Sequence, residues 1–527
     1  MKKLVVLTAV AGLGLTALSP AAAQAQSKPA SIKWHACAAG TGLPDYKAAF
    51  PTLAKVTLQC ATIKVPVDFR HPRGKKLTLA LSRLKHTGKG KARHMLVNPG
   101  GPGGTGTDFA IAVAGRASAK LMAKYDIVGF DPRGTGGSGA LSCDSHYFDP
   151  VRPDYNPKTK ADIRFWLSKS KAYAKACGKK YGKLLNHIKT VDNVHDMDAI
   201  RGRLGDRKLD FYGASYGTYL GAVYASLFPR KVGRFTLDSN VDPRGVWYDA
   251  NLEQDKAFDR NLNILWGWIA KHDADFHLGT SQKAVKDLYY KTRTELITKP
   301  VDVKIDGEQV KVGPDELDDT WLGAGYRASS IRWTDLARAL AARSKGDDTG
   351  IATTFLTYGA SSEDGYPVYT GTQCTDVQWP TSWKKWQADN TRLAKKYPFE
   401  TWNNAWYNAP CLYWPAKAGR PVKITAKRGL PKILLFQATL DAATPFAGGP
   451  QLQKQLNAKL IIEDGGLTHG IVQRGNAPID AAFEAFMLTG KLPKKRTTHV
   501  PSLGEPAVAP AATARTQGTT PGDLLLK

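Results

Sequence analysis

Short apolar runs bounded by glycine or proline constrain the fold of this chain more than any other feature. They occupy residues 95–97, 127–130, 209–212, 235–237 and 433–436. Runs of this length and composition are typical of strands buried on both faces of a parallel sheet. Helical pattern follows two of the runs, at 218–227 and 481–488, so strands and helices alternate. The sequence therefore predicts an α/β fold, with a mostly parallel central sheet and flanking helices.

A different pattern precedes the first run. Residues 63–67 and 77–81 read as strands, and the segment 71–75 between them has turn chemistry, which predicts an antiparallel hairpin.

Residues 239–431 form a long insertion between two expected core strands. The insertion is rich in Trp and in apolar residues at helical spacing, and helices are expected at 251–271 and within 321–345. We expect this insertion to be a cap over the sheet edge. The expected division of the chain is a signal peptide at 1–25, a core at 34–242 and 431–495, a helical cap at 243–430 and a flexible tail at 496–527.

The N-terminus has the features of a secretory signal peptide. Met1-Lys2-Lys3 precedes an apolar run at 4–18 and the small-x-small sequence Ala23-Gln24-Ala25, which predicts cleavage after Ala25, with Ala23 as the alternative. The run is shorter than the ~20 residues of a membrane span. We therefore expect a secreted, extracellular protein without a transmembrane segment; an uncleaved anchor is the alternative.

Six cysteines, an even number in an exported chain, are expected to form disulfides. Pairing of sequence neighbours is the most economical arrangement, although the sequence leaves the connectivity open, and free thiols are the alternative. Their spacing is unlike that of zinc motifs, so no metal is expected. The expected pairs are Cys37 with Cys60, Cys143 with Cys177, and Cys374 with Cys411.

The chain carries 74 Lys and Arg against 46 Asp and Glu, a formal net charge of +28. The basic residues are dispersed, with local concentrations at 70–93, 158–189 and 494–496, and aromatic residues are not interleaved with them as in a nucleic-acid module. No nucleic-acid partner is expected. The charge is interpreted as a surface property that favours loose association with an anionic cell envelope.

The strongest local motif is Gly213-Ala214-Ser215-Tyr216-Gly217, which lies between an expected strand and an expected helix. This G-x-S-x-G pattern is typical of a nucleophile elbow, where the turn is too tight for side chains at the glycines and the serine is held exposed. A serine hydroxyl is a weak nucleophile that needs a base, and the base needs a carboxylate to orient it. Ser215 is therefore the expected nucleophile.

Asp441 and His469 complete the order Ser, acid, His. Asp441 follows the strand at 432–436, and His469 follows the last expected strand and has a glycine neighbour. Asp238, at the end of the run 235–237, is an alternative acid. His187 and His195 are less suitable as bases because they precede the serine.

The negative oxygen of a tetrahedral intermediate needs two fixed N–H donors. We expect one from the backbone of Tyr216 and the other from the glycine-rich loop 98–106, with Gly101 preferred to Gly100. The same loop also spells G-x-G-x-x-G, but Pro102 would disturb the turn of a dinucleotide site and an exported protein meets little NAD. No cofactor is expected.

Four segments together resemble the secreted tripeptidyl aminopeptidase branch of the α/β-hydrolases, which is related to proline iminopeptidases. They are residues 98–104, 126–134, 213–217 and the region of Asp441 and His469, and the resemblance extends over roughly 34–492. It implies an α/β-hydrolase fold, a triad of Ser215, His469 and Asp441, an oxyanion hole at Gly101 and Tyr216, and release of short peptides from free N-termini. Thr105 stands where the family loop commonly has Ser.

An aminopeptidase must also recognise the substrate ammonium group, so a carboxylate should project from the cap. Asp376, two residues after Cys374, is the preferred residue and Glu253 the second; a salt-bridged or solvated acid is the alternative for both. The expected function is a secreted serine exopeptidase acting on peptides with a free N-terminus. A carboxylesterase or other small-molecule hydrolase, a proline iminopeptidase releasing single residues, and a cationic binding protein are the alternatives.

Overall fold

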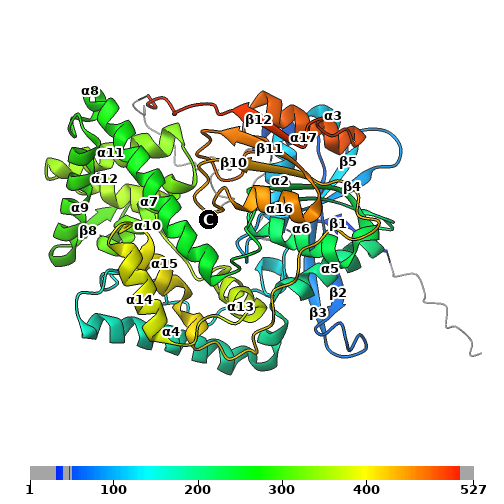
Figure 1. Ribbon diagram of the computed structural model, residues 1–527, viewed down its shortest axis with the longest axis horizontal. Helices are drawn as coiled ribbons and strands as arrows, with labels where there is room; N and C mark the ends of the chain where they lie inside the picture. The colour runs from blue at the N-terminus through cyan, green and yellow to red at the C-terminus, as the bar shows by residue number, and fades with distance from the viewer. Residues whose placement is uncertain (1–30, 39–46, 48–49, 511–527) are drawn as a thin grey trace, which may run out of the picture.

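Ten strands form one sheet, which lies in the right half of Figure 1. The computed structural model describes residues 31–38, 47 and 50–510, so the expected signal peptide lies outside it. The strand order is β1-β2-β3-β5-β4-β6-β7-β10-β11-β12. Neighbouring strands are antiparallel from β1 to β5 and parallel from β5 to β12. Their bounds are β1 (His35–Ala36), β2 (Leu58–Pro66), β3 (Lys76–Leu84), β4 (Arg93–Asn98), β5 (Tyr125–Phe130), β6 (Leu209–Ala214), β7 (Val232–Asp238), β10 (Leu434–Ala438), β11 (Lys459–Asp464) and β12 (Thr497–Pro501).

Helices cover both faces of this sheet. In β4, Met95 and Val97 pack into the core under α2 and α17, whereas Leu96 packs into the opposite core under α5 and α6. A strand whose successive side chains are buried on both faces must be apolar throughout, which explains why the core strands read as continuous apolar runs. The predicted α/β architecture and the hairpin of β2 and β3 are confirmed. The bounds of these elements are α2 (Gly106–Arg116), α3 (Ala119–Met122), α5 (Thr190–Arg203), α6 (Tyr216–Leu227), α16 (Gly448–Leu456) and α17 (Ala477–Thr489), with short 3-10 turns at η1 (Pro51–Leu53), η2 (Gly136–Ser138) and η4 (Pro229–Lys231).

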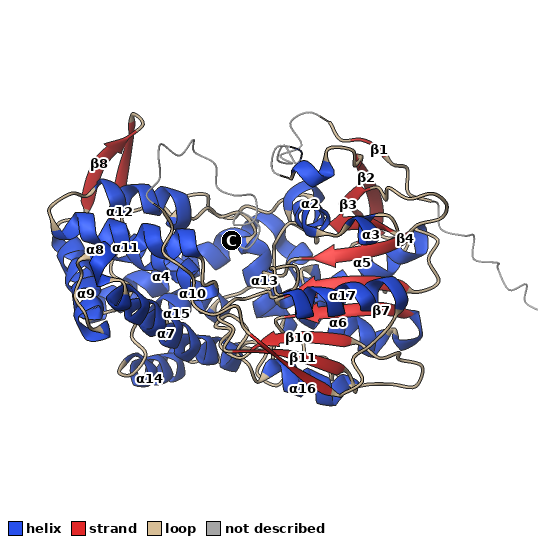
Figure 2. Cartoon of the chain, turned by 90° about the horizontal axis from the view of Figure 1, so that it is seen from above, coloured by secondary structure: helices blue, strands red, loops and turns tan. Residues whose placement is uncertain are grey.

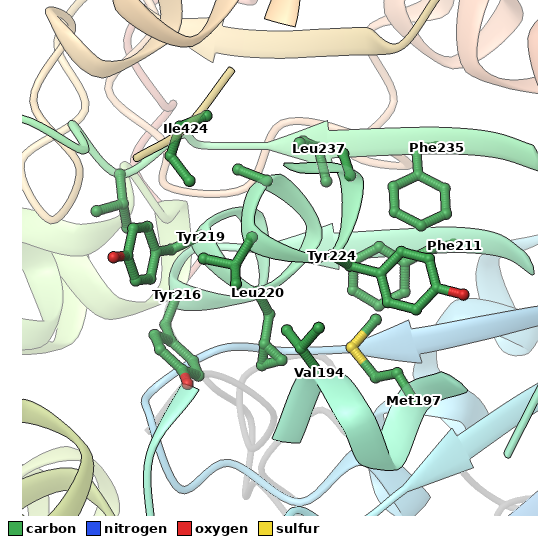
Figure 3. Close-up of a cluster of buried hydrophobic side chains, with 14 of the residues drawn as sticks. Val194, Met197, Phe211, Tyr216, Tyr219, Leu220, Tyr224, Phe235, Leu237 and Ile424 are labelled. Atoms are coloured by element: carbon green, nitrogen blue, oxygen red, sulfur yellow. The ribbon is translucent and has the colours of Figure 1, made fainter. Parts of the chain in front are cut away.

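The core on the α5 and α6 face positions the helix that follows Ser215. Figure 3 shows Val194 and Met197 of α5 beside Leu220 of α6, with Phe211 and Phe235 contributed by the sheet. All five side chains are fully buried. The helix α6 is therefore packed rigidly against the sheet from its first turn onward.

The insertion between β7 and β10 folds as a separate layer of helices beside the sheet (Figure 2). Its own core contains Trp266, Trp268, Trp321 and Trp333, which accounts for the Trp-rich sequence. The helical prediction is correct apart from one antiparallel hairpin, β8–β9. The bounds are α7 (Tyr248–Lys271), α8 (Asp273–Phe276), α9 (Gln282–Thr298), β8 (Val301–Ile305), β9 (Glu308–Val312), α10 (Pro314–Tyr326), α11 (Ser330–Ser344), α12 (Thr349–Thr354), the π-helix η5 (Phe355–Gly359), α13 (Tyr366–Asp376), α14 (Trp383–Ala394), α15 (Thr401–Asn408) and η6 (Ala409–Leu412).

A second insertion, between β5 and α5, also belongs to the cap. It contains α4 (Lys160–Tyr181) and η3 (Gly182–His187). Trp166 of α4 stacks on Trp406 of α15, with ring centroids 5.8 Å apart. Upstream of α4, Arg152 is ion-paired with Asp319 of α10 at 2.7 Å. The prediction that residues 34–242 belong to the core is therefore wrong for this segment, because its apolar face is buried against the cap.

The three disulfides join sequence neighbours, as expected: Cys37–Cys60, Cys143–Cys177 and Cys374–Cys411. Each closes a short stretch of chain within one region of the fold. Among the described residues, no helix combines the length and hydropathy of a membrane span.

The flexible tail predicted from residue 496 is wrong for its first part. Residues 497–501 form β12, the edge strand parallel to β11. Beyond it the chain crosses to the cap, where the indole of Trp268 donates a hydrogen bond to the Pro506 carbonyl at 2.8 Å, and the Ala509 amide donates to the Thr334 hydroxyl at 2.9 Å. These hydrogen bonds between cap side chains and the backbone stabilise a segment whose Ala- and Pro-rich composition indicated disorder. The remainder, 511–527, lies outside the described residues.

Candidate active site

Ser215 lies in the sharp turn between β6 and α6. Its backbone has φ 57° and ψ −128°, a conformation that non-glycine residues rarely adopt. Its amide donates to the Asp238 carbonyl at 3.0 Å, and its carbonyl accepts from the Thr218 amide at 2.8 Å. A Cβ on Gly213 would lie 2.5 Å from the Gly217 carbonyl oxygen, so the turn admits only glycine there. The geometry is that of the expected nucleophile elbow.

Asp441 and His469 are in direct contact. The Nδ1 atom of His469 lies 2.9 and 3.0 Å from the two carboxylate oxygens of Asp441, and both side chains are buried. Thr444 donates to the same carboxylate through its amide and its hydroxyl, each at 2.9 Å. These donors leave the carboxylate one orientation, and the carboxylate in turn directs Nε2 of His469 away from itself.

The cap holds the backbones of both residues. The His469 amide donates to the Tyr326 carbonyl at 2.8 Å, and the Tyr326 ring packs edge-on against the imidazole at 5.7 Å. Arg260 and Asn261 of α7 donate to the Leu440 carbonyl at 2.7 and 2.9 Å. The position of the Asp441–His469 pair therefore depends on contacts from α7 and α10 as well as on the core.

Asp238, the alternative acid, has a different task. Its carboxylate accepts from the amides of Ile471 and Val472, each at 3.0 Å, and from the Tyr212 hydroxyl at 3.1 Å. It is fully buried, and burial raises its pKa. Asp238 anchors the loop that follows His469, and the contact with Nδ1 is made by Asp441.

The two residues expected to provide the oxyanion donors line the same cavity. Tyr216 is the first residue of α6, so its amide belongs to the turn whose N–H groups have no intrahelical partner. In the glycine-rich loop, the Gly100 amide already donates to the Asn98 side chain at 3.0 Å, whereas Gly101 lines the cavity described next. This geometry favours Gly101 over Gly100.

A cavity of about 1350 Å³ lies between the cap and the carboxyl ends of the core strands. Ser215, His469, Gly101 and Tyr216 all line it. Ligand pockets for small molecules commonly have 300–1,000 Å³, so this cavity has room for a larger ligand, such as a peptide of several residues. Among the described residues, no three His, Cys, Asp or Glu side chains converge as a metal site requires.

The prediction that Asp376 projects towards Ser215 is wrong. Asp376 is buried at the end of α13 and is not among the residues that line the cavity. Its carboxylate accepts from the amide and hydroxyl of Thr190 at 2.8 and 2.5 Å and from the Trp247 indole at 3.3 Å. Burial raises its pKa to about 6. The second candidate, Glu253, does line the cavity, but its side chain is 58% exposed and ion-paired with Lys256.

Glu400 is the cavity carboxylate that the sequence analysis missed. It directly precedes α15, is 6% exposed and lines the cavity, and its Oε2 atom has no hydrogen-bond partner among the described residues. Burial, with Asp255 and Asp319 nearby, raises its pKa well above the ordinary value. Burial raises the pKa of Tyr326, and the charges of Glu400 and Asp441 raise it further. In the sequence, Glu400 is marked only by aromatic residues on both sides, within 397–402, and this pattern is too common to identify a binding residue.

Replacing Asp376 by Asn is expected to lower stability without affecting amine recognition. The amide cannot accept all the hydrogen bonds of the carboxylate, which costs about 1–3 kcal/mol of unfolding free energy. Urea unfolding measures this loss, and kcat/KM for matched peptides with free and acetylated N-termini measures recognition. A changed preference between the two peptides would contradict this assignment and return Asp376 to the substrate site.

The comparisons with known proteins agree with this geometry. A family model described as "alpha/beta hydrolase fold" matches residues 93–281, and one described as "TAP-like protein" matches 397–499. A tripeptidyl aminopeptidase of Streptomyces lividans is 37% identical over 91% of this chain and 89% of that protein. Two Mycobacterium tuberculosis proteins are each 30% identical: "Serine protease Hip1", over 82% of this chain and 86% of its own, and "Carboxylesterase B", over 83% and 85%. The chain therefore belongs to the tripeptidyl aminopeptidase family of the α/β-hydrolases.

Proposed function

We propose that this protein is a serine aminopeptidase that releases short peptides from the free N-termini of its substrates. The observation that carries the proposal is one cavity holding both an acyl-transfer site and a buried, unpartnered carboxylate. The serine elbow and the Asp441–His469 pair provide the acyl transfer, and Glu400 provides a site for a cation. The family membership supports the same reaction.

In the proposed reaction the Ser215 hydroxyl oxygen attacks the substrate carbonyl carbon while Nε2 of His469 takes its proton. Asp441 holds the Nδ1–H and stabilises the imidazolium. The carbonyl oxygen becomes negative and accepts from the amides of Gly101 and Tyr216. Collapse breaks the peptide bond, and His469 returns the proton to the departing amine. A water molecule then repeats the sequence on the Ser215 ester and releases the N-terminal fragment.

Glu400 is proposed to bind the substrate ammonium group. A buried carboxylate without a partner carries a desolvation cost that a bound cation removes. Glu400 lines the same cavity as Ser215, and so does Tyr326, whose ring packs against His469. This supports a position in which the amine is held at Glu400 while a bond a short distance along the peptide meets Ser215. A substrate without the positive charge would leave Glu400 unpaired.

The test compares a chromogenic tripeptide bearing a free N-terminus with the same peptide acetylated. We expect acetylation to lower kcat/KM by at least about 10-fold, since a charge-assisted hydrogen bond contributes about 1.5–3 kcal/mol. Dipeptide and single-residue analogues in the same assay identify how many residues leave together. Equal rates for both peptides, or turnover of simple esters alone, would contradict the proposal.

A carboxylesterase is the second candidate function. It is favoured by the relative named "Carboxylesterase B" and by an acyl-transfer site that is indifferent to the leaving group. The unpartnered Glu400 argues against it, because a neutral ester offers no cation to a buried carboxylate.

We further propose that the protein acts outside the cell. Three disulfides support an oxidising compartment. Loose retention at an anionic envelope is proposed from the charge surplus, which includes the basic residues on the exposed side of α4.

A further inference from the structure

The glycine-rich loop that carries Gly101 touches the cap through bare backbone. A Cβ added to Gly103 would overlap the carbonyl oxygen of Gly365, and a Cβ added to Gly365 would lie 2.7 Å from the carbonyl oxygen of Gly103. Both residues have positive φ, 97° and 75° respectively. The two backbones are therefore in direct contact, and only glycine fits at either position.

Gly365 is held firmly on the cap side by Glu363. The Glu363 carboxylate is buried and accepts from the Ser142 hydroxyl at 2.7 Å, the Asp144 amide at 2.8 Å and the Tyr173 hydroxyl at 2.9 Å. It also accepts from the amide of Cys143, which is disulfide-bonded to α4. The segment behind Gly365 is thus fixed to the second insertion.

On its other side Gly365 begins a helix. It is the N-cap residue of α13, and its carbonyl accepts from the Tyr369 amide at 2.8 Å. Gly365 lies between two fixed segments, Glu363 and α13, and these hold its backbone against Gly103.

The opposite side of the loop lies against the nucleophile elbow. A Cβ on Gly100 would lie 2.7 Å from the Cβ of Ser215 and 2.9 Å from the Tyr216 amide nitrogen. The Gly104 amide donates back to the Gly100 carbonyl at 3.2 Å, which closes the loop around Gly101. The loop therefore lies between the core elbow on one side and Gly365 of the cap on the other.

We infer that Gly365 is a positioning residue for the oxyanion hole: by its backbone contact with Gly103, the cap sets where the Gly101 amide points. This inference rests on the proposed function, in which Gly101 and Tyr216 receive the negative oxygen, and extends it by giving the cap a part in the chemical step. The cap then does more than enclose the substrate. Acyl transfer proceeds at full rate only when the segment at Gly365 is seated against the loop.

A displaced oxyanion donor weakens the transition state more than the bound substrate. Loss of a whole donor costs about 10²–10³ in kcat. We expect Gly365→Ala to lower kcat by about 10- to 100-fold and to change KM by less than about threefold, because the donor is moved rather than removed.

The experiment measures kcat and KM on the free-amine tripeptide substrate, together with two inhibition constants. A tripeptide aldehyde forms a tetrahedral adduct with Ser215 whose negative oxygen needs the oxyanion hole. The matching tripeptide alcohol, with CH2OH in place of the C-terminal carbonyl group, has the same residues but no oxygen that becomes negative there. The expected result is weaker inhibition by the aldehyde, by a factor similar to the loss in kcat, with inhibition by the tripeptide alcohol unchanged. Equal weakening of both inhibitors, or of neither, would overturn the inference.

Gly346→Ala is the matched control. Gly346 also lies in the cap with a positive φ, 89°, but no atom lies within 4 Å of its Cβ position. Gly346→Ala therefore introduces a similar backbone strain without a contact with the glycine-rich loop. Its kcat should stay within about twofold of wild type, since surface substitutions usually have small effects. An equal fall in kcat for both variants would assign the effect to strain and overturn the positioning role.

Glu363→Gln tests the same role should Gly365→Ala fail to fold. It keeps the side-chain size but removes the carboxylate that holds the segment, so inhibition by the aldehyde should weaken relative to inhibition by the tripeptide alcohol. An unchanged ratio of the two inhibition constants would overturn the inference.

An activated ester, assayed in parallel, separates the proposed aminopeptidase function from the proposed positioning role of Gly365. Wild type that cleaves the ester but not the tripeptide contradicts the aminopeptidase function, whereas unchanged ester turnover by a folded Gly365→Ala contradicts the positioning role.

Discussion

Turnover is expected to fall by at least about 10⁴-fold when Ser215 is replaced by alanine. Removing the hydroxyl leaves His469 and Asp441 in place but removes the atom that forms the acyl-enzyme, so only binding and the oxyanion donors remain. Steady-state rates on a tripeptide chromogenic substrate measure the loss, and a fluorophosphonate that labels activated serines should label wild type and not Ser215→Ala.

Folding must be unchanged for this result to be informative. The Ser215 side chain makes no hydrogen bond in the described structure, so the melting temperature should change by no more than a few degrees, which corresponds to about 1 kcal/mol or less for a chain of this size. Ser361→Ala is the matched control, because Ser361 lines the same cavity from the cap, and it should retain most of the activity. More than trace activity in a folded Ser215→Ala would remove Ser215 from the role.

Glu400→Gln is expected to raise KM for free-amine peptides by about 10- to 100-fold. The substitution keeps the shape of the side chain and removes the charge, and a hydrogen bond to a charged group contributes about 1.5–3 kcal/mol. An acetylated peptide cannot form that ion pair, so its kcat/KM should be unchanged or higher. Glu253→Gln is the control: its half-exposed carboxylate should change KM by less than about threefold.

The same carboxylate predicts a pH dependence with a definite sign. Burial and neighbouring acids raise the pKa of Glu400, so at low pH it is neutral and offers the ammonium group no charge. The preference for free over acetylated peptide should therefore grow as the pH rises through this raised pKa, until the substrate amine itself loses its proton near pH ~8. Glu400→Gln should abolish the rising part. A wild-type preference that is constant with pH would contradict amine binding at Glu400.

Local motifs were sufficient to predict the sharp turn at Ser215, but not the direction of the Asp376 carboxylate. The elbow at Ser215 is dictated by neighbouring residues, because glycines at 213 and 217 are needed wherever a strand turns so sharply into a helix. The prediction for Asp376 was wrong because the direction of its side chain depends on the tertiary structure and not on neighbouring residues. A nearby disulfide does not determine where the Asp376 side chain points, and in the fold its carboxylate accepts hydrogen bonds from Thr190 and Trp247.

The boundaries of the cap could likewise not be predicted from local sequence. The segment containing α4 reads as ordinary helical sequence, and its place in the cap follows from the stacking of Trp166 on Trp406, 240 positions later along the chain. The chain after residue 496 has the composition of a tail, yet hydrogen bonds from Trp268 and to Thr334 hold part of it against the cap. Contacts between distant segments outweigh composition in both cases.

The sequence by itself determined the α/β class, the disulfide-bearing character of the chain, and the order of Ser215, Asp441 and His469. Each of these depends on periodicity, on residue type or on neighbours in the chain. Only the tertiary structure decided which carboxylate lacks a partner in the cavity and which part of the cap meets the glycine-rich loop. The burial of Glu400 and the contact of Gly365 with Gly103 arise from segments far apart in the chain, and a linear pattern contains no measure of that distance.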